Sequence, residues 1–412
     1  MKTYLLLGIF CCLSLTMQGQ NTWLGVNTNW NDGANWTAGI PTSASYVRIN
    51  SGPSNFPVLT GNVTVHRCEM NGGAVSLGSY ELKSDSSYLL LSTLNSTGGK
   101  FTTGEAVRFG RNSISGVITL EIDKGYLYGN VFNNAMTLIA NAPSGGSDAV
   151  IVGWIRPDTF KGETTFINKG SQNGMIVGVQ ADGGFDTTVF EQKFTFRNES
   201  TVANATSVFG NGEYTASAKV VFKGQVVLEG THTGINQPLL SFINAEFRQP
   251  VTVKMQGGTI RFGVTQLYTR SVVFQSSLLL DTPGTTVEFG DGFTPSRMSA
   301  AGTISVASGQ MTSGELRFYK YRSLTTTSQL IQLNGSGTDS SYATRILTTD
   351  STDFAGAVYL RADRVQLDGG RFAAQTTVEQ LGASSATRAM GGIINSVTTL
   401  NAGGNRFLDS LI

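Results

Sequence analysis

The sequence predicts an all-β fold: a right-handed parallel β-helix, or β-solenoid, of roughly 12–15 coils with a Trp-rich cap at its N-terminal end. Two observations predict it. A seven-residue pattern recurs, in which Phe, any residue, a small residue and any residue precede an apolar, a Thr-like and an apolar residue. From Phe132 to Phe274 its starts recur at intervals of roughly 25–32 residues. This period indicates stacked coils, because a β-propeller blade needs about 40–50 residues.

The pattern identifies the residues that we expect in the core. The Phe and the apolar positions four and six residues later are evenly spaced, so their side chains point to one face of a strand. Each Phe should stack on the Phe of the next coil at about 4.8 Å, the distance between paired strands. The expected core row is Phe132, Phe160, Phe190, Phe222, Phe247, Phe274, Phe354 and Phe372, with weaker copies of the pattern at Leu59 and Ile114.

The composition favours short strands joined by frequent turns. Gly accounts for 50 of the 412 residues, which suits a chain that must bend at short intervals. A second strand often follows the pattern, as in 175–179 and 258–263. No Phe starts a copy between Asp281 and Asp353, although 300–306 fits with Ala300 in place of Phe. We expect degenerate coils or an excursion there.

The segment 1–19 has the features of a secretory signal peptide. Lys2 supplies a positive charge, residues 4–15 are apolar, and the small residue Gly19 marks a cleavage site. The apolar stretch is too short to span a bilayer, and an uncleaved anchor is the alternative. Cleavage leaves Cys68 without a disulfide partner in the chain. We therefore expect a secreted or cell-surface protein that has no membrane span once the signal is removed.

Residues 20–58 form a Trp-rich module. Trp23, Trp30 and Trp36 lie close together in the sequence, separated by Asn, Asp and Gly residues that favour turns. An open solenoid exposes unpaired backbone at its ends, so we expect this module to cap the first coil. The alternative is a glycan-binding platform, in which exposed faces of the three tryptophans stack on sugars.

Residues 59–412 make up the predicted solenoid, and its end matches the start of a repeat. The segment Phe407–Ile412 fits the first six positions of the pattern. This favours a chain truncated inside a repeat. A coil without a cap presents bare backbone donors and acceptors, so we also expect end-to-end self-association.

The motifs argue against catalysis. The 29 basic and 28 acidic residues nearly cancel, which disfavours electrostatic binding to nucleic acid. Parallel β-helices include polysaccharide lyases and glycoside hydrolases, but the nearest grouping for such chemistry is Glu288, Asp291 and Arg297, which we interpret as a solvated acidic turn. His66 and Cys68 could share one face of a strand but supply only two of the four ligands of a zinc site. We expect no catalytic residues, metal ions or cofactors.

The opening WLGVNTNWNDGANWTAGIP, followed by FPVL, resembles the N-terminal module of large surface proteins of Bacteroidetes. In that family a W-x-G and N-W-x-x-G-x-P pattern precedes the strands that begin a β-helix. Repeat segments such as FAGAVYLRADRVQLDGG are also similar. The resemblance covers nearly the whole mature chain and implies an exported, adhesin-like protein of the cell outer membrane. Relatives often end in a secretion-sorting domain that this chain lacks, which supports the expected truncation.

We therefore expect an exported, non-catalytic surface protein that acts as an adhesin or a stalk. A long regular face suits this role, because many weak contacts add up through multivalency. Its expected partners are extracellular glycans or other surface proteins. Two alternatives stay open: a carbohydrate-active β-helix enzyme, either a polysaccharide lyase or a glycoside hydrolase, and a structural spacer without any ligand.

Overall fold

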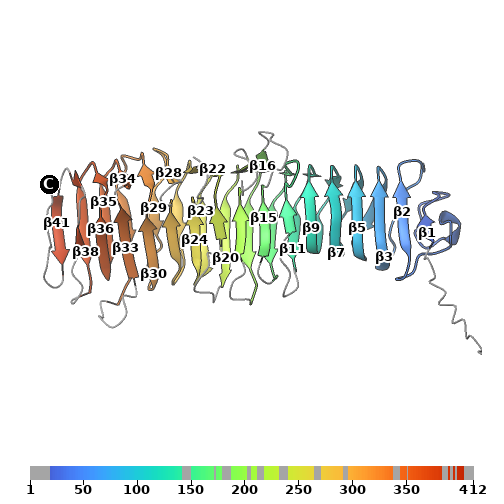
Figure 1. The fold of residues 1–412 in the computed structure, drawn as a ribbon, viewed down its shortest axis with the longest axis horizontal. Coiled ribbons are helices and arrows are strands. Elements are labelled where there is room, and N and C mark those ends of the chain that lie inside the picture. Colours follow the sequence, from blue (N-terminus) through green and yellow to red (C-terminus); the bar gives the residue numbers. More distant parts are fainter. Residues whose placement is uncertain are drawn as a thin grey trace, which may run out of the picture.

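Equivalent strands of successive coils pair in parallel, and in the computed structural model they build one elongated stack (Figure 1). The pairing is parallel from β1 (Gln20–Thr22) with β2 (Tyr46–Asn50) at one end to β38 (Thr376–Gln380) with β41 (Val397–Ala402) at the other. The predicted parallel β-helix is confirmed. The structure describes residues 19–402 except 142–149, 171–172, 179–186, 202–205, 211–217, 232–239, 264–270, 291–295, 337–343, 350, 383–387, 390–392 and 395–396.

One sheet contributes a strand to each coil from Ala74 onward and therefore counts those coils. Over the described residues it has 14 strands in chain order, which is within the predicted number and gives this part of the stack a length of about 60 Å; the coils before it join this wall only through the bridges Asn29–Val58 and Val58–Ser76. These first strands are β4 (Ala74–Gly78), β6 (Thr93–Ser96), β8 (Ser113–Ser115), β10 (Val131–Phe132), β13 (Thr159–Phe160), β16 (Thr187–Phe190), β19 (Lys219–Phe222), β22 (Ala245–Phe247), β25 (Val272–Phe274), β28 (Ser296–Met298), β31 (Tyr321–Ser323), β34 (Asp353–Phe354), β37 (Arg371–Phe372) and β40 (Ile393–Ile394).

Most coils from β10 onward add a second and a third strand. The second strands are β11 (Met136–Ala140), β14 (Thr164–Asn168), β17 (Phe194–Asn198), β20 (Val226–Thr231), β23 (Val251–Gln256), β26 (Leu278–Leu280), β29 (Ile304–Val306), β32 (Gln329–Gln332), β35 (Val358–Ala362), β38 (Thr376–Gln380) and β41 (Val397–Ala402). The third strands are β12 (Val150–Val152), β15 (Asn173–Val177), β18 (Thr206–Phe209), β21 (Leu240–Phe242), β24 (Thr259–Phe262), β27 (Thr286–Phe289), β30 (Gly314–Phe318), β33 (Thr344–Thr349), β36 (Arg364–Asp368) and β39 (Arg388–Ala389).

The N-terminal coils are shorter, because their second and third strands merge into one long strand. The strand β9 pairs with both β11 and β12, which shows the equivalence. Val75, Leu94, Ile114 and Phe132 are in register, and the intervals between them are shorter than any between the repeats from Phe132 to Phe274. The N-terminal strands are β1 (Gln20–Thr22), β2 (Tyr46–Asn50), β3 (Val63–Asn71), β5 (Glu81–Leu90), β7 (Gly99–Gly110) and β9 (Ile118–Tyr128), and the 3-10 helix η1 spans Gly33–Asn35.

A column of phenylalanines runs through the core along the first strands. The eight phenylalanines named from the sequence are at most 1% exposed. From Phe132 to Phe274, successive ring centroids are 4.6–5.0 Å apart and the rings lie within 4–15° of parallel. The coil spacing therefore sets the ring spacing, as stacking of equivalent residues requires. We call the eight phenylalanines the first Phe column.

The column continues without Phe through the region where no copy of the pattern starts. Met298 pairs with Phe274, and Ser323 pairs with both Met298 and Phe354. Met298, not Ala300, holds the column position, because the turn that follows it is longer than in the regular copies. The ring of Tyr321 lies 5.3 Å from Phe289 and 5.4 Å from Phe354. It fills volume that the small Ser323 leaves.

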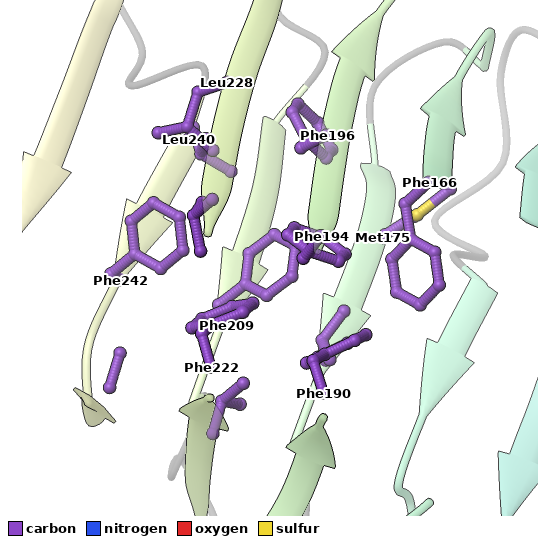
Figure 2. Packing of buried hydrophobic residues seen from close by; sticks show 14 of the residues in the cluster. Phe166, Met175, Phe190, Phe194, Phe196, Phe209, Phe222, Leu228, Leu240 and Phe242 are labelled. Carbon is purple, nitrogen blue, oxygen red and sulfur yellow. The ribbon is translucent and has the colours of Figure 1, made fainter. Parts of the chain in front are cut away.

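A second column of phenylalanines faces the first across the core (Figure 2). Its members come from successive third strands, with centroids 4.9–5.8 Å apart. Rings of the two columns meet edge to face, as Phe242 and Phe247 do at 5.1 Å and 73°. Close packing of large rings from two walls explains why the middle of the stack has a Phe-rich interior. The second Phe column is Phe209, Phe242, Phe262, Phe289 and Phe318.

The Trp-rich module closes the N-terminal end. The ring of Trp36 packs edge to face between Trp23, at 4.9 Å, and Trp30, at 4.8 Å. The indole N–H of Trp23 donates to the Asn55 carbonyl at 2.7 Å, and that of Trp36 donates to the Trp30 carbonyl at 2.8 Å. The three indoles are continuous with the hydrophobic core of the stack. The module therefore caps the first coils, with its buried N–H groups satisfied.

A buried polar ladder lines one corner of the N-terminal coils. The side-chain oxygen of Asn112 accepts from the Ser92 backbone N–H at 2.9 Å, and that of Asn130 accepts from the Asn112 N–H at 3.0 Å. The ladder ends at Asp158, whose carboxylate accepts from Asn130 at 2.7 Å and from the Gly153 N–H at 2.8 Å. Burial of this carboxylate raises the pKa of Asp158 to about 7.

Candidate functional site

The tryptophans considered as a sugar platform are buried. Trp23, Trp30 and Trp36 are 2%, 1% and 3% exposed. A ring must present a free face to stack on a sugar, and these faces are covered by one another and by the first coils. The structure therefore corrects the glycan-binding interpretation of the three residues: they are the hydrophobic core of the cap.

Glu288, considered as part of an acidic turn, lies on β27 in an ion-pair network. Its side chain is 7% exposed and accepts from Arg261 on β24 and, at 2.9 Å, from Arg317 on β30. These arginines occupy the equivalent positions of the preceding and following coils. Arg317 also pairs with Glu315, which is 3.6 Å from Arg345. The carboxylate of Glu288 is thus engaged by two guanidinium groups and is not free for acid–base catalysis.

His66 and Cys68 do not share a face. The strand β3 bends between them, so His66 is exposed and lies 2.9 Å from Asp85, while Cys68 is fully buried. Burial raises the pKa of the Cys68 thiol to about 12, which keeps it protonated. Among the residues that the structure describes, no group of three or more His, Cys, Asp or Glu is placed to hold a metal ion. Asp291 lies outside the described residues.

A different group of side chains gathers on the outer face of the N-terminal coils. Glu69 on β3 is in register with Tyr88 on β5, and Tyr88 is in register with Arg108 on β7. The Arg108 guanidinium carbon lies 5.9 Å from the centre of the Tyr88 ring. On β9, Tyr126 immediately precedes Leu127, which pairs with Phe109. One outward column therefore alternates between tyrosine and arginine in these coils.

Two large aromatic side chains pack together at the end of this column. The ring centroids of Tyr126 and Trp154 are 4.3 Å apart with their planes tilted by 35°. Tyr126 is 37% exposed, and Trp154 is half-buried. Trp154 follows β12, whose Ile151 is in register with Tyr126. The pair forms one apolar surface, with Tyr126 on a paired strand and Trp154 in the bend that follows β12.

The adjoining corner carries two bulky residues in a backbone conformation that favours glycine. Leu91 has φ 54° and Arg111 has φ 55°, whereas the neighbouring coils place Gly72 and Gly129 at this corner. Both side chains are exposed, Leu91 by 55%. A left-handed conformation costs a residue with a Cβ about 1–2 kcal/mol. Such strain is found where the surrounding structure enforces it, and it often marks a functional site.

Arg111 and Arg156 flank the glycine of the coil that lies between them. A methyl group placed on Gly129 would lie 3.5 Å from Cγ of Arg111 and 3.3 Å from Cβ of Arg156. The two side chains therefore extend from either side of a glycine gap. Burial raises the pKa of Tyr128, while the nearby charges of Arg108 and Arg111 oppose that rise. The arginines thus share one small area of the surface.

We define the arginine–aromatic patch as Tyr88, Arg108, Arg111, Tyr126, Trp154 and Arg156. Within the described part of the chain, its three arginines form no ion pair with a carboxylate. Glu69, the nearest acid in the column, is held by Arg48 at 2.9 Å and lies 3.9 Å from Arg67. Most other arginines are paired: Arg48, Arg67, Arg197, Arg248, Arg261, Arg317, Arg322, Arg345 and Arg361. Over the residues described, Arg297 and Arg371 are also unpaired with a carboxylate; Arg297 is in register with Arg322, which pairs with Asp353, and Arg371 is in register with Asp353.

Sequence reasoning did not identify this patch, although a signal was present. Tyr88, Arg108 and Tyr126 are separated by the same two intervals as Leu94, Ile114 and Phe132. The signal becomes visible only when the short N-terminal coils are recognised. The left-handed corner at Arg111 has no such signal, because bulky residues rarely adopt that conformation.

No protein-family model, curated protein or solved structure matches this chain. In the part of the chain that the structure describes, no helix is long and apolar enough to cross a membrane. The expected signal peptide and the expected uncapped end at Phe407–Ile412 lie outside the described residues, apart from Gly19.

Proposed function

We propose that the chain is an exported, non-catalytic surface protein whose β-helix acts as an adhesin or stalk and presents the arginine–aromatic patch to a partner. The patch is the observation that carries the proposal. Its arginines are exposed and, among the described residues, unpaired with carboxylates, on a molecule where most arginines are neutralised within the fold. Groups of unpaired charges and exposed aromatic rings are typical of binding surfaces.

Two features favour adhesion over the alternatives. A spacer gains nothing from backbone strain at Leu91 and Arg111, where glycine would serve. A lyase or hydrolase needs an acid or base beside its substrate, whereas the described surroundings of the patch supply arginines and tyrosines, and Glu288 is held in ion pairs. The elongated stack and the resemblance to Bacteroidetes surface proteins both support a role at the cell surface.

Export is tested on the full chain with a C-terminal tag in a Gram-negative host. We expect mass spectrometry to find a mature N-terminus near Gln20 and added protease to remove the tag from intact cells. Retention of an unprocessed chain in the cytoplasm would contradict the proposal.

Adhesion is tested with beads coated with the purified protein. The beads are offered surfaces that carry acidic polysaccharides, neutral polysaccharides or extracellular proteins. We expect retention on at least one surface, together with no release of unsaturated products from polyuronates with or without Ca²⁺. Beads that bind none of the surfaces would favour the spacer, and product release would favour the enzyme.

A further inference from the structure

We propose that the arginine–aromatic patch binds an acidic polysaccharide, a chain of sugars that bear carboxylate or sulfate groups, lying along the axis of the rod. This inference rests on the proposed function and specifies its ligand. Three properties of the patch carry it: the unpaired guanidinium groups, the fixed aromatic surface and the strained corner.

The arginines provide recognition of oxyanions. A guanidinium group has a planar fork of N–H donors that binds a carboxylate or a sulfate through two parallel hydrogen bonds. Arg111 and Arg156 come from the coils on either side of Gly129, and their stems converge on it. Arg108, on the strand before the Arg111 corner, adds a third guanidinium group, so a ligand that engages all three needs more than one anionic group. An acidic polysaccharide meets this requirement.

The aromatic pair provides a surface for the sugar rings. The rings of Tyr126 and Trp154 pack against each other at 4.3 Å; Tyr126 lies on β9, and Trp154 lies just beyond the strand that pairs with it. The C–H face of a pyranose ring is apolar and rests favourably on such a surface. Rigid aromatic side chains lose little conformational entropy when they bind. The patch thus combines an apolar contact with anion recognition. These two properties match the apolar ring face and the anionic groups of a charged sugar.

The strained corner indicates that the position of Arg111 matters. At φ 55°, glycine is the favourable residue, and the next coil has Gly129 there. Arginine at this position directs a guanidinium group outward beside the glycine gap that also holds the Arg156 stem. Leu91 has the same conformation one coil earlier. What distinguishes Arg111 is its exposed guanidinium group, which makes no ion pair among the described residues and is available for binding.

Charge favours a polysaccharide over nucleic acid. The formal net charge of the chain is +1, and the patch offers three arginines. Tight nucleic-acid binding needs contacts to many phosphates and falls steeply with salt. A sugar polymer that also gains from apolar stacking depends less on the number of charges. An oligonucleotide is nevertheless a necessary arm of the test.

The test is a calorimetric titration of the full chain at two salt concentrations. The probes are a polyuronate oligosaccharide, a sulfated oligosaccharide, a neutral oligosaccharide of equal length and a single-stranded oligodeoxynucleotide. We expect one or both acidic sugars to bind, the neutral sugar to bind at least 10-fold more weakly, and affinity to fall moderately with salt. The two acidic probes distinguish a carboxylate ligand from a sulfate ligand.

Substitutions locate the site. Arg111→Gln and Arg156→Gln should each weaken binding about 10-fold, and Trp154→Ala should weaken it by a similar factor. Arg371→Gln is the matched control, because it removes an exposed, unpaired arginine far from the patch and should leave affinity within about twofold. Melting curves verify that each variant folds. If a variant does not fold, Arg111→Lys and Arg156→Lys keep the charge while removing the bidentate geometry, and should still weaken binding.

The outcomes separate this inference from the proposed function. Equal affinity for neutral and acidic sugars, full affinity in the Arg111 and Arg156 variants, or preferential binding of the oligonucleotide would overturn the acidic-polysaccharide site. In the first two cases the coated beads still adhere, so the adhesin proposal survives. If no sugar binds and the beads adhere to nothing, both proposals fail.

Discussion

Arginines in one outward column of the β-helix have different neighbours in two regions of the molecule. Near the N-terminus, Arg108 stands between coils that carry tyrosines, and its charge is not matched by a carboxylate among the described residues. Towards the C-terminus, Arg261 and Arg317 stand on either side of Glu288 and are paired through it. Where charges of opposite sign alternate between coils, the side chains form ion pairs that stabilise the fold. Alternation with aromatic residues leaves the guanidinium group available for a partner.

The inward side of the two regions differs as well. In the short N-terminal coils, Val75, Leu94 and Ile114 occupy the column that phenylalanine occupies from Phe132 onward. Longer coils enclose a wider interior, which larger side chains fill. The outer surface and the core therefore change near the same coils, around β9 and β10.

The largest effect is expected in the Phe-rich core. Phe222 stacks on Phe190 and on Phe247, each at 5.0 Å. Phe222→Ala should lower the free energy of unfolding by about 3–5 kcal/mol, through lost burial and a cavity between stacked rings. Ile114→Ala, in the same column, removes a smaller side chain and should cost less. Urea unfolding measures both, and equal losses would show that ring stacking adds nothing to the column.

The buried ladder of the N-terminal coils should make stability depend on pH. Burial raises the pKa of Asp158 to about 7, above its value in the unfolded chain, so the folded protein binds the proton more tightly. This contribution to stability is fully present below about pH 4, falls as pH rises, and is lost above about pH 7.

Asp158→Asn isolates that contribution. The amide has no charge to bury, so the fall of about 2–4 kcal/mol between pH 4 and pH 8 should be missing from the variant. In the variant, the amide NH2 group replaces a carboxylate oxygen and cannot accept from both Asn130 and the Gly153 N–H. The variant should therefore be less stable than the wild type at pH 4. The readout is therefore the difference in pH dependence. Parallel pH profiles would show that the carboxylate does not titrate in this range.

The ion-pair network should respond to loss of its central acid. Glu288→Gln leaves Arg261 and Arg317 facing each other with no carboxylate between them. Because both arginines keep partial contact with water, we expect a loss of about 2 kcal/mol rather than the larger cost of a fully buried pair. Arg108→Gln should change stability by less than about 0.5 kcal/mol. Equal losses in the two variants would remove the distinction between the regions.

The smallest expected effect on stability is a gain. Arg111→Gly relieves the left-handed conformation and should raise the free energy of unfolding by about 1 kcal/mol. Leu91→Gly relieves the same conformation one coil earlier and should give a similar gain without changing charge. Binding of the acidic oligosaccharide should weaken, by about 10-fold, only in the Arg111 variant. A loss of stability in both variants would show that the corner is not strained.

The sequence predicts the stack because one residue type repeats in register. The first Phe column recurs at nearly regular intervals along the chain, so its period is visible without any structure. The second Phe column was missed, although apolar–Gly pairs such as Phe209–Gly210 and Phe262–Gly263 mark its corners. The N-terminal coils are harder to recognise in the sequence, because their column positions hold aliphatic residues such as Leu94 and Ile114, which are common in any strand.

The candidate site is harder to predict because it depends on neighbours in space. The sequence places Trp23 and Trp36 among turn residues, which suits both a cap and a sugar platform. Only packing distinguishes the two, and the indoles cover one another. The patch requires the register of β5, β7 and β9, which has shifts that a periodic reading does not contain.

The central claim is that the unpaired arginines bind while the paired arginines stabilise. Its most direct test measures oligosaccharide affinity and urea unfolding together for the Arg111→Gln, Arg156→Gln double variant and for Glu288→Gln. We predict a crossed result: the double variant loses affinity about 100-fold and keeps its stability, and Glu288→Gln loses stability and keeps its affinity. A double variant that binds the acidic oligosaccharide as the wild type does would contradict the account.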